Sequence, residues 1–144
     1  LVLSLGLASG RTDLAVERVA INVADFSIPD ASKRKPADAP IDPTGPSAYF
    51  ATIPIKRVVR ALLSKGIPAS ISNTAGTYLC NFIMYTSLNH VARNRLHAKA
   101  GFIHVPNLPD QVAEKYLTSS SQLPSMSLKT MLTGIEIAIK TSLP

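Results

Sequence analysis

The chain alternates short apolar segments of strand length with longer segments that repeat apolar residues at helical spacing. The strand-like runs lie at residues 1–7, 16–23, 69–73 and 100–106, and the helical patterns lie at residues 52–66, 80–95 and 127–140. Strands that alternate with helices are typical of an α/β domain, in which the helices cover the sheet. We therefore expect a three-layer αβα arrangement, with a mostly parallel twisted sheet and helices on both faces.

The overall composition excludes several classes of protein. The chain has 144 residues, of which 46% are hydrophobic, so we expect a single domain over residues 1–144 with a sizeable core. The net charge is +6, but the basic residues are scattered and accompany neither an RNA-binding aromatic signature nor zinc-finger spacing. No apolar run approaches the roughly 20 residues of a membrane-spanning helix. We expect neither nucleic acid nor a membrane as a partner.

A single cysteine, Cys80, excludes an internal disulfide framework and a cysteine-rich zinc site, and it fits a reducing cytoplasm. The apolar run at residues 1–7 has no basic segment before it, so it does not read as a signal peptide. It reads instead as a buried strand that starts with the first residue of the chain. This predicts that an upstream segment has been removed or that the chain is a fragment.

Residues 27–46 are predicted to form a long loop. Five prolines and the basic triplet Lys33-Arg34-Lys35 oppose regular structure there. We interpret the triplet as solvent-exposed rather than as a nucleic-acid site. A loop of this length is expected to cover a site or to meet a neighbouring subunit. After it, Thr52 is expected to cap a helix that has Pro54 near its start and ends at Gly66.

The segment at residues 71–82 reads as a buried strand, a turn of small residues and the first turn of a helix, with Cys80 at the helix start. A helix N-terminus has a partial positive charge and free N–H groups. It therefore favours the thiolate, which attacks carbonyl groups, and can stabilise an oxyanion. Two readings of Cys80 remain open here: a nucleophile, or a small buried hydrophobic residue, which is the more frequent role of a lone cysteine.

Two further candidates lie near the ends of strands. Glu17 lies among aliphatic residues, and His104 lies near the carboxyl end of the run at 100–106. The carboxyl ends of parallel strands share one side of a sheet, so Glu17, Cys80 and His104 are expected to approach one another, as nucleophilic catalysis requires. The alternatives are an exposed Glu17 on an edge strand, which we favour from the residues alone, and a His104 hydrogen-bonded in the core.

The sequence resembles the pyroglutamyl peptidase I family, also called pyrrolidone carboxyl peptidase. The resemblance runs through nearly the whole chain, and the segments around Cys80 and His104 most resemble archaeal members. The matching blocks are Gly10-Arg11, Val16-Glu17-Arg18-Val19-Ala20-Ile21-Asn22, Ile28-Pro29-Asp30, Gly45-Pro46-Ser47-Ala48-Tyr49, Pro54-Ile55-Lys56, Gly66-Ile67-Pro68-Ala69, Thr74-Ala75-Gly76-Thr77-Tyr78-Leu79-Cys80-Asn81, Gly101-Phe102-Ile103-His104-Val105-Pro106 and Pro124-Ser125-Met126-Ser127.

The resemblance implies a role for each candidate. Cys80 is the implied nucleophile, His104 the general base and then acid, and Glu17 the group that orients His104. The family removes an N-terminal pyroglutamyl residue from peptides without a metal or an organic cofactor, and its members are commonly dimers or tetramers. It also places Ile28, Tyr78 and Leu79 along the apolar slot that receives the lactam ring. Such walls suit an uncharged ring better than a charged α-amino group.

The chain also departs from the family pattern. The family's Gly-Phe-x-Pro-Phe segment, about seventy residues upstream of this first residue, is not in the sequence, and Phe82 stands where many bacterial members carry a histidine. The expected function is a cysteine exopeptidase for N-terminal pyroglutamate. The alternative is a truncated, non-catalytic or assembly-dependent subunit of the same fold, and a related thiol hydrolase such as an amidase is a third reading.

Overall fold

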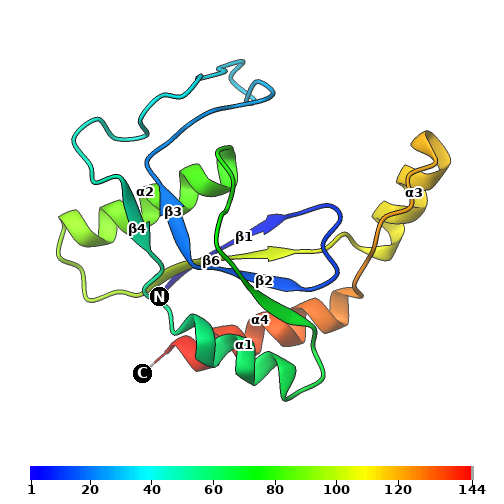
Figure 1. Ribbon diagram of the computed structural model, residues 1–144. Helices are drawn as coiled ribbons and strands as arrows, with labels where there is room; N and C mark the ends of the chain where they lie inside the picture. Colours follow the sequence, from blue (N-terminus) through cyan, green and yellow to red (C-terminus); the bar gives the residue numbers. More distant parts are fainter. Residues whose placement is uncertain (144) are drawn as a thin grey trace. The chain divides into compact units, whose positions relative to one another are not determined.

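A computed structural model describes residues 1–143 of the chain (Figure 1). Strands and helices alternate through the middle of these residues, whereas the first four elements are all strands and the last two are both helices. In chain order they are β1 (Val2–Leu7), β2 (Leu14–Glu17), β3 (Val19–Ile21), β4 (Ala48–Phe50), α1 (Ile55–Leu63), β5 (Ala69–Ser72), α2 (Leu79–Arg93), β6 (Ala100–Val105), α3 (Pro109–Ser119) and α4 (Leu128–Ser142).

Four strands form one sheet in the order β1-β6-β2-β5, and β3 pairs with β4 in a separate two-stranded sheet. In the pair of β1 and β6, successive backbone hydrogen bonds join residues whose numbers rise together in both strands, so the pair is parallel. The same holds for β2 and β5. The strands β2 and β6 are antiparallel. The predicted α/β class with a mostly parallel sheet is confirmed, as a mixed sheet.

The antiparallel pairing corrects one step of the sequence argument. The strand that ends at Glu17 and the strand that carries His104 were expected to run in the same direction. In the structure, Ala15 pairs with His104 and Val16 pairs with Ile103 in antiparallel register. The expectation that β2 and β6 present their carboxyl ends at the same edge of the sheet is therefore wrong.

The chain packs as two compact units. The first contains residues 1–4, 17–53 and 72–102. Within it, α2 packs against the antiparallel pair of β3 and β4, in which Val19 pairs with Phe50 and Ile21 with Ala48. Several buried residues of this unit form a hydrophobic cluster: Ala20, Ala75, Met84, Tyr85, Leu88, Val91, Ala100 and Phe102.

The second unit contains residues 5–16, 54–71 and those from Ile103 onward. Helices α1 and α4 pack side by side in it (Figure 1). Gly134 lets α4 pack closely on β2, because a Cβ atom at that position would overlap the Leu14 side chain. Val58 and Leu62 of α1 and Met131 of α4 are buried.

The ends of the helices differ in detail from the expectation. Helix α1 begins at Ile55 with Pro54 as its N-cap, so the prediction that Thr52 caps it is wrong. Thr52 instead hydrogen-bonds to Ala100: its backbone N–H donates to the Ala100 carbonyl at 2.9 Å, and its Oγ1 accepts from the Ala100 N–H at 2.7 Å. Ser127 caps α4 through a bond from the Thr130 N–H. Every helix within residues 1–143 is too short or too polar to cross a lipid bilayer.

Candidate active site around Cys80

A turn of small residues carries the chain from β5 to α2. At its start, the Ser72 hydroxyl donates to the Thr74 carbonyl at 3.0 Å, and the Gly76 N–H donates to Thr74 Oγ1 at 3.0 Å. Gly76 has φ of 78°, a left-handed conformation that glycine adopts without steric cost. Helix α2 then begins at Leu79, so Cys80 is its second residue. The prediction that Cys80 lies at a helix start is confirmed.

The first turn of α2 leaves backbone donors available. Phe82 is the first residue whose N–H bonds back within the helix, to the Tyr78 carbonyl at 3.0 Å. Tyr78 is the N-cap, and within the described chain its side chain makes no capping bond. The N–H groups at the start of any helix have no intrahelical partner, and together with the helix dipole they attract negative charge. The start of α2 can therefore stabilise a thiolate or an oxyanion.

Cys80 itself is partly buried and packs against the hydrophobic cluster of the first unit. The cluster residues nearest to it in sequence are Ala75, Met84 and Tyr85. Cys80 is thus held by packing on one side while the residue as a whole stays partly exposed. This intermediate burial differs from the fully buried cysteine of the alternative reading.

Asn81 is a positioning residue that the sequence did not single out. Its Oδ1 accepts from the Ile21 N–H at 2.9 Å, and its Nδ2 donates to the carbonyls of Ile21 at 2.9 Å and Val23 at 3.0 Å. The side chain is 1% exposed. It therefore ties the first turn of α2 to β3 and the residues after it. The available signal was an asparagine inside the first turn of a helix, where such a side chain competes for backbone partners.

A second set of contacts fastens residues 25–29 to the turn before Cys80. Asp25 and Thr77 exchange two bonds: the Asp25 N–H donates to the Thr77 carbonyl at 3.1 Å, and the Thr77 hydroxyl donates to the Asp25 carbonyl at 2.9 Å. The Tyr78 hydroxyl donates to the Pro29 carbonyl at 3.2 Å. The rings of Phe26 and Tyr78 meet edge to face, with centroids 4.7 Å apart.

These contacts place the residues predicted to bind the substrate around one segment. Tyr78 and Leu79 directly precede Cys80, and Ile28 lies beside the Pro29 carbonyl that Tyr78 holds. Ile28 is 61% exposed and Leu79 is exposed as well. Apolar side chains are thus available to a ligand next to the thiol.

A cavity of about 500 Å³ opens next to this segment, a size typical of small-ligand pockets. Leu79 and Phe82 of α2 form part of its wall, and Phe26 packs edge to face with Phe82 at 6.4 Å between ring centroids. The remaining lining comes from the proline-rich loop: Asp30, Arg34, Lys35 and Pro36. That loop contains neither a helix nor a named strand over residues 27–47, as predicted.

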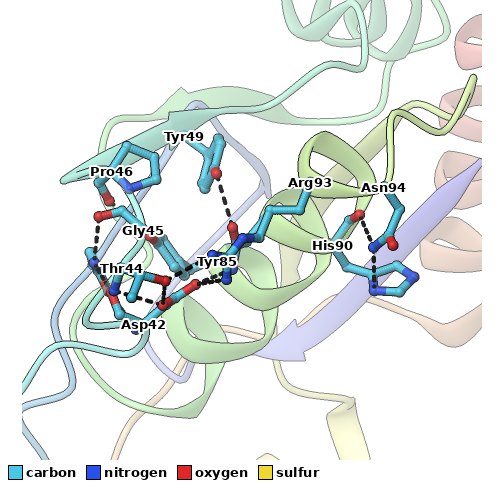
Figure 2. Close-up of polar contacts among 11 residues, drawn as sticks. Asp42, Thr44, Gly45, Pro46, Tyr49, Tyr85, His90, Arg93 and Asn94 are labelled. Atoms are coloured by element: carbon cyan, nitrogen blue, oxygen red, sulfur yellow. Dashed lines mark hydrogen bonds and ion pairs between the residues drawn. The ribbon is translucent and has the colours of Figure 1, made fainter.

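The far part of the loop is held to the other end of α2 by Asp42 (Figure 2). Its carboxylate accepts from the Arg93 guanidinium at 2.8 Å and from Asn89 Nδ2 at 2.8 Å. It also accepts from the backbone N–H and the hydroxyl of Thr44, both at 2.8 Å. These donors, the Thr44 N–H first, lower the pKa of Asp42 from 3.8 to about 2.

Tyr85 on α2 adds a second anchor in the same region. Its hydroxyl donates to the Pro46 carbonyl at 2.7 Å (Figure 2). Burial raises the pKa of Tyr85, so the hydroxyl stays protonated and remains a donor. The loop is therefore fastened to α2 near both of its ends.

Glu17 is the last residue of β2 and is fully buried. The interpretation favoured from the residues, an exposed carboxylate on an edge strand, is wrong. The neighbouring Arg18 extends the pairing toward β5, since its N–H donates to the Ser72 carbonyl at 2.8 Å. Its side chain donates from Nε to Asn73 Oδ1 at 2.7 Å. Glu17 therefore lies in the strand that pairs with the one leading to the Cys80 turn.

His104 lies on β6 and is 7% exposed. Three residues further on, the fully buried Asn107 follows the strand. Asn107 Oδ1 accepts from the Ser9 hydroxyl at 3.1 Å and from Lys115 Nζ at 3.0 Å. These bonds fix the chain after β6. The structure places Glu17, Ile28, Tyr78, Leu79 and Cys80 in the first unit and His104 in the second.

Comparisons with known proteins agree on one family. A family model described as pyroglutamyl peptidase matches residues 1–143. Pyrrolidone-carboxylate peptidase 1 of Caldanaerobacter subterraneus subsp. tengcongensis is 57% identical over 139 residues, which are 96% of this chain and 66% of the relative. The pyrrolidone-carboxylate peptidase of Thermococcus onnurineus is 50% identical over 143 residues, which are 99% of this chain and 68% of the relative.

A solved structure agrees with the fold as well. Pyrrolidone carboxyl peptidase of Pyrococcus furiosus superposes with a TM-score of 0.93 at 44% identity, over 97% of this chain and 67% of that one. The chain spans 66% and 65% of the lengths of two Caldanaerobacter relatives that it matches.

Proposed function

Since this chain belongs to the pyroglutamyl peptidase family, we propose that it is a cysteine exopeptidase, which hydrolyses the amide bond after an N-terminal pyroglutamyl residue of a peptide. The observation that carries the proposal is the place of Cys80 as the second residue of α2. There a thiolate and an oxyanion are both stabilised by the same helix start. The buried carboxylate of Glu17 in the same unit adds support.

In the proposed reaction, the Cys80 thiolate attacks the carbonyl carbon of the pyroglutamyl residue. A carbon–sulfur bond forms, and the carbonyl electrons move to the oxygen, which accepts hydrogen bonds from N–H groups at the start of α2. The carbon–nitrogen bond then breaks, and the protonated His104 gives its proton to the departing amine. A thioester on Cys80 and a peptide shortened by one residue result.

Water completes the cycle. His104, now neutral, accepts a proton from a water molecule as its oxygen attacks the thioester carbon. The carbon–sulfur bond breaks, pyroglutamate leaves, and the thiolate and the protonated imidazole are restored. Each step uses side chains of this chain and water alone.

We infer a role for Glu17 in orienting His104 from the resemblance to the family. Glu17 is the fully buried last residue of β2, and His104 is a buried residue of β6. A carboxylate that bonds to an imidazole fixes its tautomer and stabilises its charged form.

Selectivity for the lactam ring would follow from the apolar side chains beside the thiol. Ile28, Tyr78 and Leu79 offer walls without a charged partner for an α-amino group. An unmodified N-terminus would lose the hydration of its ammonium group there without compensation. A pyroglutamyl residue, whose nitrogen is an uncharged lactam, does not incur this cost.

The proposal is tested with a pyroglutamyl fluorogenic amide, alongside prolyl and glutaminyl amides. We expect the chain to release the fluorophore from the pyroglutamyl amide only, and the Cys80→Ser variant to be inactive. If the parent chain is as inert as Cys80→Ser, the alternative of a non-catalytic or assembly-dependent subunit replaces the proposal. Cleavage of the other two amides at comparable rates would favour a broader thiol amidase.

We further propose that the chain forms a homo-oligomer, a dimer or tetramer, in a reducing cytoplasm. Its single cysteine and the apolar side chains that it exposes support this, with Phe50 70% and Leu117 86% exposed. Light scattering of the eluting protein would give the subunit number, and a monomer at micromolar concentration would contradict the proposal.

A further inference from the structure

The cavity beside Cys80 has an apolar side and a basic side. The proposed removal of a pyroglutamyl residue does not account for all the side chains on either side. Phe26, Leu79 and Phe82 supply the apolar side, and Arg34 and Lys35 supply the basic side. The basic residues belong to the triplet Lys33-Arg34-Lys35, for which the sequence predicts solvent exposure. In the structure, two members of that triplet line the cavity.

The charged side chains that line the cavity leave a net positive charge. Asp30 accepts from the N–H groups of Ser32 at 2.9 Å and Arg34 at 2.8 Å, and from Arg34 Nε at 3.2 Å. The Arg34 N–H, with the guanidinium charge, lowers the pKa of Asp30, which therefore remains a carboxylate paired with Arg34. Lys35 makes no hydrogen bond or ion pair with residues 1–143. The ammonium group of Lys35 is the uncompensated charge.

We propose that this cavity receives the residues that follow the pyroglutamyl residue in a peptide substrate, and that it favours an acidic side chain among them. The inference rests on the proposed function. Leu79, which directly precedes Cys80 on α2, lines the cavity, so the cavity begins one residue away from the nucleophile. An extended peptide advances about 3.5 Å per residue, so two or three residues beyond the cleaved bond span the region of the cavity. There an apolar residue contacts Phe82, and a carboxylate meets Lys35.

Peptide pairs test the charge preference directly. The chain is assayed with two pyroglutamyl peptides that differ only by glutamate or glutamine in the second or third position. We expect kcat/KM to be about three- to fivefold higher for the glutamate peptide, the size of an exposed charge pair. The ratio should fall toward one in 0.5 M salt, because the lysine is exposed and screened. In Lys35→Gln the ratio should also approach one, and in Lys35→Glu it should invert.

Lys33→Gln is the matched control, since Lys33 belongs to the same triplet but does not line the cavity. This variant should keep the parent's ratio of glutamate to glutamine substrates. A parent ratio of one overturns the inference, and so does an equal loss of preference in Lys33→Gln and Lys35→Gln.

A binding experiment separates failure of this inference from failure of the proposed function. The Cys80→Ser chain is titrated with fluorescently labelled peptides of the same two sequences, and anisotropy is measured. We expect the glutamate peptide to bind about three- to fivefold more tightly, and the difference to vanish in a Lys35→Gln, Cys80→Ser double variant. Equal binding, or no binding of either peptide, overturns the inference whether or not the parent chain is active.

Discussion

Asn81 holds both backbone groups of Ile21: its Oδ1 accepts from the Ile21 N–H and its Nδ2 donates to the Ile21 carbonyl, each at 2.9 Å. The two residues are sixty positions apart, and the bonds join the turn of helix that carries Cys80 to β3. A cysteine at a helix start can act only if that start is fixed relative to its surroundings. The asparagine after Cys80 provides this fixation inside the first unit.

Replacing Asn81 with alanine should therefore affect both stability and activity. The variant leaves the N–H and carbonyl of Ile21 and the carbonyl of Val23 without the side chain that satisfies them. We expect a loss of about 3 kcal/mol in the free energy of unfolding, measured by urea denaturation. Asn94→Ala, at the exposed C-terminal end of the same helix, is the control and should cost less than about 1 kcal/mol. Similar losses in both variants would contradict the assigned role.

Glu17→Gln tests the proposed catalytic arrangement with little change of volume. The side chain is fully buried, and the amide retains its shape but not its negative charge. If Glu17 stabilises the protonated imidazole of His104, kcat should fall by about 10²- to 10⁴-fold. The pH profile of kcat should change as well, which a purely structural role would not produce. Glu114→Gln, which alters an exposed carboxylate on α3, should behave like the parent.

The alternation of apolar runs and helical repeats was sufficient to predict the fold class, because each pattern reports how a single element is buried. The position of Cys80 was predicted for the same reason: a strand, a small-residue turn and a helix start are local signals. The direction of β2 relative to β6 was not predictable, because parallel and antiparallel partners require the same apolar residues. Only the paired positions Ala15 and His104 reveal it.

The burial of individual polar residues also could not be predicted from the sequence. Glu17 reads as exposed because carboxylates mostly are, and its burial depends on what packs around β2. Thr52 has the right chemistry for a helix cap, but its hydroxyl binds the backbone of Ala100 instead. Asn81 bonds to Ile21 and Val23, about sixty residues away, which the asparagine in the first helical turn does not identify. Asp42 has a local partner in Thr44, but its bonds to Asn89 and Arg93 also join distant residues. Tertiary contacts decided each of these cases.

The Asp42 network predicts how stability depends on pH at the acid end. The folded-state pKa of Asp42 is about 2, below its ordinary value of 3.8, so its carboxylate stabilises the fold fully above about pH 4. That contribution is lost as the pH falls from 4 to 2. Asp42→Asn should therefore have a lower urea midpoint than the parent at pH 6, and the difference should shrink toward pH 2. A difference that is independent of pH would contradict this account.

Gly45→Ala should destabilise the loop that Asp42 and Tyr85 hold. An added Cβ would overlap the Tyr85 hydroxyl, which is fixed by its bond to the Pro46 carbonyl (Figure 2). We expect a loss of about 1–3 kcal/mol in the free energy of unfolding. The same substitution in a Tyr85→Phe background should cost less, because the overlapping oxygen is gone. Equal costs in both backgrounds would show that the hydroxyl is not the obstacle.

Substitutions of Tyr78, two residues before Cys80, separate the effect of its hydrogen bond from the effect of its ring packing. Its hydroxyl bonds to the Pro29 carbonyl at 3.2 Å, and its ring packs against Phe26. Tyr78→Phe removes only the hydrogen bond, which is worth about 1 kcal/mol, so KM for a pyroglutamyl amide should rise about fivefold with kcat little changed. Tyr78→Leu also removes the aromatic contact and should raise KM further. If Tyr78→Phe instead lowers kcat and leaves KM unchanged, the hydroxyl acts on the reacting atoms rather than on the loop that carries Ile28.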